Sequence, residues 1–168
     1  MRYHTANAPP TAEGAIQIAM EELPITIHDA RALVIGFGRL GRALAPRLRC
    51  LGAHVWVSAR RYEQRSAAES MGLGSEGMDR LSDWLCSYDL VFNTVPAQVL
   101  GVEELAALKE RALVIDLASR PGGVDMEAAA ALGVRVIWAL SLPGKAAPVT
   151  SGRYIKDTIY HIMEESDL

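Results

Sequence analysis

The chain has 168 residues and a formal net charge of −3, and half of its residues are hydrophobic. This balance is typical of a globular protein with one ordinary domain. The chain has no excess of basic residues, which a protein that binds nucleic acid would be expected to have. No apolar run approaches the ~20 residues of a membrane span, and the first residues do not resemble a signal peptide. Cys50 and Cys86 lack metal-type spacing. We therefore expect reduced thiols in a cytoplasmic protein without a metal site.

The first predicted element is a helix over residues 11–23, because apolar side chains recur there at three- and four-residue spacing until Pro24. From residue 31 onward, short Val- and Ile-rich runs alternate with helical segments. The sequence predicts strands at 32–35, 54–57, 89–93, 112–116 and 134–138. It predicts helices at 39–51, 62–71, 79–86, 102–109, 125–132 and 148–164. Pro46 predicts a bend or a 3₁₀ turn in the helix that contains it.

The alternation of strands and helices predicts the fold class. The strand segments are almost continuously apolar, as expected for a parallel sheet that is buried on both faces. Right-handed crossovers then place helices on both sides, which gives an α/β, Rossmann-like, doubly wound sheet of five to six strands. We assign residues 30–168 to this dinucleotide-binding domain and residues 1–29 to an N-terminal tail and helix. Ile155, Ile159 and Ile162 form an apolar stripe on the last helix.

A glycine-rich turn follows the first predicted strand. The segment GFGRLG at 36–41 matches the GxGxxG pattern between a strand and a helix. In that context the glycines allow a tight turn, a close approach of the backbone to a pyrophosphate, and close packing of helix on strand. The free N–H groups at the helix start favour the phosphate charge. The residues expected to contact the cofactor here are Gly36, Gly38, Arg39, Leu40 and Gly41.

The end of the second predicted strand indicates which dinucleotide binds. An acidic side chain about 20 residues after the glycine turn usually holds the ribose 2′-hydroxyl of NAD. This chain has Ser58 there, followed by Arg60 and Arg61. Arginine attracts a 2′-phosphate, which a carboxylate would repel. We therefore expect a preference for NADP(H), with NAD(H) possible, and the alternative is that the arginines are a solvated helix start.

Ligands of open α/β sheets bind at the carboxyl ends of the strands, so the later strand ends supply further candidates. For the cofactor these are Asn93, Thr94, Val95, Pro96, Asp116 and Ala118. For an anionic substrate they are Ser119, Arg120, Lys145, Thr150 and Ser151. The alternative is that proline and glycine only shape these loops while the cations are solvated. The sequence assigns no catalytic residue, because the nicotinamide itself supplies hydride chemistry.

Five motifs, in order, closely resemble the A-chain family of bacterial dipicolinate synthases: PTAEGAIQ (10–17), VIGFGRLG (34–41), NTVPAQVL (93–100), VIDLASRPGG (114–123) and LPGKAAPVTSG (142–152). The resemblance implies a C-terminal NADP(H)-binding Rossmann domain. It also implies the oxidation of a hydroxylated tetrahydro- or dihydrodipicolinate to dipicolinate, a dicarboxylate, during sporulation. The B chain of the synthase is the partner that it implies, and Thr11 and Glu13 are implied to lie near the substrate.

One feature departs from that family. An N-terminal domain of comparable size precedes the TAEGAIQ helix there, whereas this sequence begins almost at that helix. We expect the 11–23 helix to continue from such a domain, and its apolar face alone to require another cover, such as a second copy of the chain. Two other functions stay open: the cofactor domain of a related hydroxy-acid or alanine dehydrogenase, and a non-catalytic nucleotide-sensing module.

Overall fold

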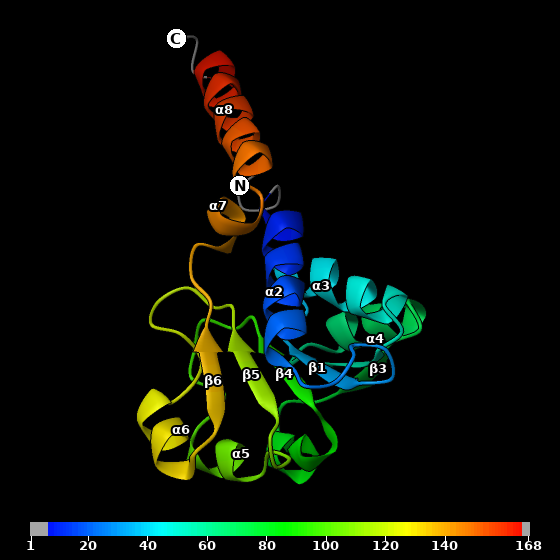
Figure 1. Ribbon diagram of the computed structural model, residues 1–168. Helices are drawn as coiled ribbons and strands as arrows, with labels where there is room; N and C mark the ends of the chain where they lie inside the picture. Colours follow the sequence, from blue (N-terminus) through cyan, green and yellow to red (C-terminus); the bar gives the residue numbers. More distant parts are fainter. Residues whose placement is uncertain (1–6, 166–168) are drawn as a thin grey trace.

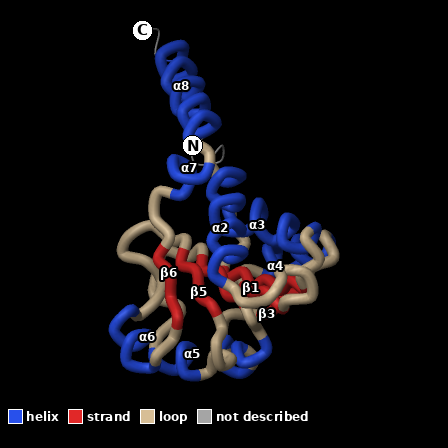
Figure 2. The backbone as a smooth tube through the Cα atoms, viewed as in Figure 1, coloured by secondary structure: helices blue, strands red, loops and turns tan. Residues whose placement is uncertain are grey.

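The computed structural model describes residues 7–165, and its centre is a six-stranded sheet (Figures 1 and 2). The strands lie in the order β3-β2-β1-β4-β5-β6, and every neighbouring pair is parallel. Their bounds are β1 Arg31–Ile35, β2 His54–Ser58, β3 Gly74–Glu76, β4 Leu90–Asn93, β5 Leu113–Asp116 and β6 Arg135–Trp138. The predicted doubly wound sheet is thus confirmed. The strand order reverses between β1 and β4, and ligands bind at such a switch point.

Helices and 3₁₀ turns connect the strands. The helices are α2 Ala8–Glu22, α3 Arg39–Cys50, α4 Tyr62–Ser70, α5 Val102–Ala106, α6 Met126–Leu132, α7 Leu142–Ala146 and α8 Pro148–Glu165. The 3₁₀ turns are η1 Leu81–Asp83 and η2 Leu85–Ser87.

Two hydrophobic cores cover the two faces of the sheet. Ala32 and Val34 of β1 point into one core, together with side chains of α2, α3 and α7. Leu33 and Ile35 point into the other, together with side chains of η1, η2, α5 and α6. Strand side chains alternate between faces, so a strand with both faces covered must be apolar at nearly every position. This is why the sequence shows continuous apolar runs.

Helix α2 packs within this body and is not left without a cover. Ala12, Ala15 and Ala19 are fully buried, and α2 packs against α3, α7 and β5. A Cβ on Gly14 would lie 3.0 Å from the Cβ of Ala146, so α2 and α7 approach closely. The cover expected for the apolar face of α2 is thus supplied within the chain, and this face gives no reason to expect a second copy. Helix α7, which the sequence did not predict, supplies much of the cover.

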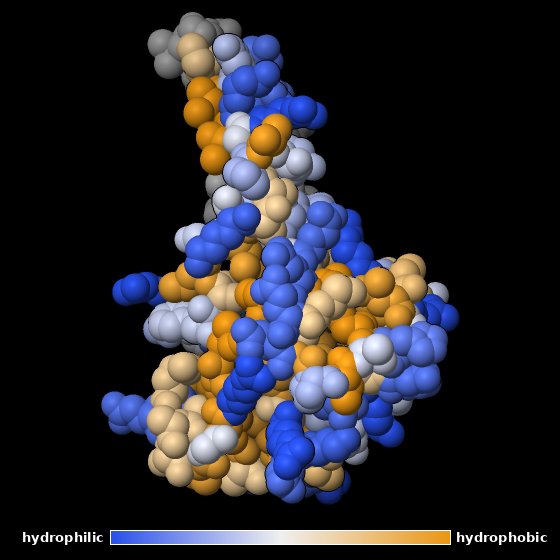
Figure 3. All heavy atoms as spheres, in the orientation of Figure 1, coloured by the Kyte–Doolittle hydropathy of each residue, from blue (hydrophilic) through white to orange (hydrophobic). Residues whose placement is uncertain are grey.

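Helix α8 extends away from the sheet beyond α7 (Figure 1). The predicted stripe of isoleucines on this helix is largely exposed, at 42% for Ile155, 52% for Ile159 and 56% for Ile162. Apolar side chains gather on the visible face of the projecting helix (Figure 3). The described part of the chain thus leaves this apolar face open to solvent.

Several elements differ from those expected. The helix predicted at 79–86 is the pair of 3₁₀ turns η1 and η2, and the helix predicted at 102–109 ends at Ala106. Strand β3 was not predicted, because its three residues Gly-Ser-Glu lack an apolar pattern. Helix α3 continues through Pro46 as α-helix, without the 3₁₀ turn proposed there.

Asp89 joins the starts of β1 and β4, at the end of the strands that lies away from the glycine turn. Its carboxylate accepts a hydrogen bond from the N–H of Arg31 at 2.9 Å and forms an ion pair with Lys109 at 2.5 Å. Burial alone would raise the pKa of Asp89. The hydrogen bonds and charges of Lys109 and Arg31 outweigh it, so the pKa lies below its usual value.

A lowered folded-state pKa means that Asp89 stabilises the fold above its unfolded pKa and loses this contribution as the pH falls. We expect Asp89→Asn to lower the free energy of unfolding at pH 7 by about 1 kcal/mol, because Lys109 is half-exposed. The difference between the variant and the wild type should shrink between about pH 5 and pH 2. Urea unfolding across this range measures it, and a difference that stays constant with pH would contradict the assignment.

Candidate functional site

The turn between β1 and α3 is built on close backbone contacts. Gly36 has φ +92°, which favours glycine, and a Cβ there would lie 2.4 Å from Oγ1 of Thr94. A Cβ on Gly41 would lie 2.1 Å from the carbonyl oxygen of Gly36. At Gly38, in contrast, no atom lies within 4 Å of the position that a Cβ would take. The turn is thus compact at Gly36 and Gly41 and open at Gly38, on the side where a phosphate would approach.

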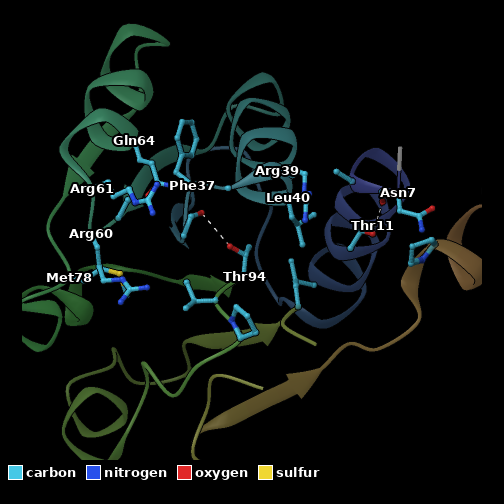
Figure 4. A pocket seen from close by; sticks show the side chains of 18 residues that line it. Asn7, Thr11, Phe37, Arg39, Leu40, Arg60, Arg61, Gln64, Met78 and Thr94 are labelled. Carbon is cyan, nitrogen blue, oxygen red and sulfur yellow. Dashed lines mark hydrogen bonds between the residues drawn. The ribbon is translucent and has the colours of Figure 1, made fainter. Parts of the chain in front are cut away.

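A pocket of about 970 Å³ lies beside this turn (Figure 4). Its walls come from the ends of β1, β2 and β4 and from the starts of α2, α3 and α4. Its lining residues are Asn7, Ala8, Thr11, Gly36, Phe37, Gly38, Arg39, Leu40, Ala59, Arg60, Arg61, Gln64, Met78, Thr94, Val95, Pro96, Leu117 and Pro143. The structure therefore brings the predicted glycine turn, both arginines and the Thr94–Pro96 loop to one cavity.

The two arginines mark one end of the pocket, with Gln64 and Met78 beside them (Figure 4). The side chain of Arg65 donates hydrogen bonds to the carbonyls of Ala59 and Arg60, at 2.9 and 3.0 Å, and so fixes the backbone of this loop. Within residues 7–165, neither Arg60 nor Arg61 forms an ion pair. Both are exposed at the start of α4, where positive charge opposes the helix dipole. A bound anion would relieve this repulsion.

Ser58 does not share this position. Its side chain is fully buried, and its hydroxyl donates to the carbonyl of Gly77 at 3.2 Å. Ser58 pairs in register with Ile35, at the end of β2. The structure does not place its hydroxyl at the pocket as the sequence predicted, because the hydroxyl holds the loop after β3 instead.

The ends of β4 and β5 also differ from their predicted roles. Thr94, Val95 and Pro96 line the pocket, and Oγ1 of Thr94 donates to the carbonyl of Ile35 at 2.9 Å. Asn93 and Asp116 are buried side by side instead, with Nδ2 of Asn93 2.8 Å from Oδ1 of Asp116.

Asn93 and Asp116 therefore bind each other and the surrounding backbone, and neither lines the pocket, in contrast to their predicted direct contact with the cofactor. Ala118 is 3% exposed, and its N–H donates to Asp116 at 3.0 Å. It too belongs to the packed loop behind the pocket.

The predicted substrate residues do not lie together. Thr11 lines the pocket, and its hydroxyl donates to the carbonyl of Asn7 at 2.7 Å. Glu13 lines a separate, apolar groove between α2 and α3, away from the pocket that Thr11 lines. Ser151 is buried, and its hydroxyl donates to the carbonyl of Pro143 at 2.8 Å, which joins α8 to α7.

The remaining members of that set are exposed outside the pocket lining: Ser119, Arg120, Lys145 and Thr150. The guanidinium of Arg120 lies over the ring of Trp138, 6.0 Å from its centroid. The described part of the chain thus does not gather these groups into one anion site.

Several lining residues were missed by the sequence analysis. Gln64 follows Arg60 and Arg61 by four and three residues, so helical spacing places it near them. Asn7 precedes Thr11, which was predicted, by four residues at the start of α2. Met78 comes from the loop after β3 and Pro143 from the short helix α7, and neither residue gives such a signal.

The described residues were also compared with the patterns of a metal site and of a membrane span. No cluster of three or more His, Cys, Asp or Glu side chains among them could hold a metal ion. None of the described helices is long and apolar enough to span a membrane.

The fold and the pocket define a nicotinamide-dinucleotide-binding domain of a dehydrogenase. Residues 7–147 match the family described as "D-isomer specific 2-hydroxyacid dehydrogenase, NAD binding domain", and the chain belongs to this family. It is also a homologue of the dipicolinate synthase A chain. It is 35% identical to that protein from Bacillus subtilis (strain 168) over 159 residues, which are 95% of this chain and 54% of the relative.

Solved structures agree with this relationship. The dipicolinate synthase A chain from Bacillus halodurans superposes with a TM-score of 0.93 at 35% identity, over 96% of this chain and 55% of that one. The A chain from Bacillus subtilis gives 0.94 at 34% identity, over 98% and 55% of the two chains. The transhydrogenase from Sinorhizobium meliloti, at 21% identity and a TM-score of 0.84 over 98% of this chain and 56% of its own, shares the fold. The chain spans about half the length of these relatives.

The glycine contacts predict different costs at two positions of the turn. We expect Gly41→Ala to lower the free energy of unfolding by about 1–3 kcal/mol, because its methyl group would overlap the backbone carbonyl of Gly36. Gly38→Ala is the matched control, and it should leave stability nearly unchanged because the space there is open. Thermal and urea unfolding measure both. Equal losses for the two variants would show that the turn is not packed as described.

Proposed function

We propose that this chain is an NADP(H)-binding domain that serves the oxidative step of a dipicolinate synthase. The observation that supports it most is the pocket in which the glycine turn and the exposed Arg60 and Arg61 share one cavity. If the 2′-phosphate of a dinucleotide lies at the arginines, its pyrophosphate would lie beside the N–H groups at the start of α3. Its nicotinamide end would then lie toward Thr94 and Thr11, on the far side of the turn (Figure 4).

The residues present fit this group. A phosphate has room at Gly38, where the backbone is open, and α3 begins at Arg39 with its first N–H groups unpaired in the helix. Arg60 and Arg61 follow by two and three residues the position that an acidic side chain takes in NAD-selective domains, and their charge would attract a 2′-phosphate. When bound, the nicotinamide ring supplies hydride transfer. The chain's own residues hold it, orient it and form the floor of its site.

The proposed reaction converts a hydroxylated tetrahydro- or dihydrodipicolinate to dipicolinate, with hydride passing to NADP⁺. The homology to the dipicolinate synthase A chain supports it. Because the relatives are about twice as long, the substrate pocket of this proposal includes surface that a second domain or chain supplies. Arg120 and Lys145 are exposed and cationic, which suits a dicarboxylate bound at such a boundary. The B chain of the synthase is the proposed partner, and the cytoplasm is the proposed location.

Cofactor selectivity tests the proposal. We expect the chain to bind NADPH more tightly than NADH in calorimetric titrations. Arg60→Ala should raise the Kd for NADPH by about ten-fold or more, since it removes a hydrogen bond between charged groups, and should leave the Kd for NADH nearly unchanged.

Arg111→Ala is the matched control, because Arg111 is also exposed and lies before the start of β5, at the end of the strands away from the pocket. This variant should bind both cofactors as the wild type does. Equal affinities of the wild type for NADPH and NADH would refute the role of the arginines. Binding of neither would refute the proposed cofactor domain itself.

We also propose that the chain forms a homodimer, with the exposed stripe of α8 as the contact. Because α2 is covered within the chain, the apolar side chains of α8 are the stronger reason for association. Light scattering at micromolar concentration should give twice the 18.2 kDa of one chain. Ile159→Lys should reduce the mass to that of one chain, and Lys156→Ala, a change of a charged side chain on the same helix, should not. A wild-type mass of 18.2 kDa would refute the dimer.

A further inference from the structure

We infer that Gln64 is a specificity-determining residue of the cofactor pocket, where its amide group binds the 2′-phosphate of NADP(H) together with Arg61. The inference rests on the proposed cofactor function and deepens it. The two arginines supply positive charge at this end of the pocket, and Gln64 supplies a directed hydrogen-bond donor beside that charge. The sequence analysis assigned no role to this side chain.

The first turn of α4 places Gln64 at the arginine end of the pocket. Arg61 is the N-cap of this helix, and Gln64 is its third residue. Gln64 lines the pocket with Arg60 and Arg61, and it lies beside Arg61 in the close view (Figure 4). The side chain of Gln64 is half-buried at this wall, whereas both arginines are exposed. An anion that reaches Arg61 therefore comes within reach of the amide group as well.

The fold makes no use of this amide group. A glutamine at the third position of a helix often turns back and accepts the N–H of the N-cap residue, as part of a capping box. In α4, the side chain of Gln64 forms neither this bond nor any other hydrogen bond within residues 7–165. Its donor and its acceptor are therefore both available on the wall of the pocket.

Arg65, the next residue, has the structural role in this turn. Its guanidinium donates to the carbonyls of Ala59 and Arg60, at 2.9 and 3.0 Å, and so holds the loop before α4. The N–H of Ala59 donates to the carbonyl of Glu76 at 3.2 Å, which ties the same loop to the end of β3. Other residues thus hold the backbone at the start of α4, and the amide group of Gln64 is left for a ligand.

A neutral amide group suits a phosphate, and a carboxylate at the same position would not. Nε2 of Gln64 can donate to a phosphate oxygen, and a hydrogen bond to a charged group is stronger than one to a neutral hydroxyl. A glutamate in place of Gln64 would repel a phosphate and pair with Arg61 at three-residue spacing. The start of a helix favours acidic side chains. The helix and the ligand therefore make opposite demands at position 64.

These opposite demands give the test. We expect Gln64→Glu to lower the ratio of the Kd for NADH to the Kd for NADPH by about ten-fold or more, measured by calorimetric titration. Its free energy of unfolding in urea should equal that of the wild type or exceed it, because a glutamate suits the first turn of the helix. Gln64→Ala should lower the ratio by about three-fold or more, since it removes the donor without adding a charge. A purely structural role would lower stability and weaken both cofactors alike.

Glu63→Gln is the matched control, because it makes the reverse change one residue earlier, at an exposed side chain outside the pocket lining. It should keep the ratio within about two-fold of the wild type. If the wild type binds neither cofactor, or both equally, the proposed function fails. If the wild type prefers NADPH and both variants of Gln64 keep that ratio, or weaken both cofactors by the same factor, the role of Gln64 alone is overturned. A shift in Glu63→Gln as large as that in Gln64→Glu would also overturn it, since long-range charge would then explain the effect.

Discussion

The contact between Gly41 and the carbonyl of Gly36 is the constraint on which the site depends. It lets α3 start directly behind the end of β1, with no room for even a methyl group between them. The N–H groups at the start of α3 consequently lie at the switch point of the sheet, where β1 and β4 diverge. The pocket therefore follows from the sheet order and from two glycines. Its selectivity is left to side chains around it.

One row of paired residues crosses the carboxyl ends of the strands. Ser58, Ile35, Asn93, Asp116 and Trp138 lie opposite one another in register. Side chains in such a row point to the same face, here the face away from α2 and α3. The polar members of the row are therefore turned from the pocket and bind the loops instead. On four of these strands, the first residue that lines the pocket comes one position later: Gly36, Ala59, Thr94 and Leu117.

The alternation of side chains between the two faces of the sheet explains what could be predicted from the sequence. The strands and the glycine turn are local patterns, because burial on both faces demands continuous apolar residues and a tight turn demands glycine. Arg60 and Arg61 were predicted for the same reason, since they follow a strand at a fixed distance. Ser58 and Asp116 were assigned to the cofactor by proximity in sequence alone. Their direction depends on where each strand ends, and a shift of one residue reverses it.

Long-range packing accounts for the other differences. The apolar face of α2 could be read from its sequence, but its cover comes from α7, more than a hundred residues later, which has Pro and Gly and no helical pattern. The same packing leaves α8 projecting with an open stripe. A helix of 18 residues with one apolar face is only marginally stable alone in water. The packing of the chain thus covers the apolar face of α2, while the apolar stripe of α8 stays exposed to solvent in the described residues.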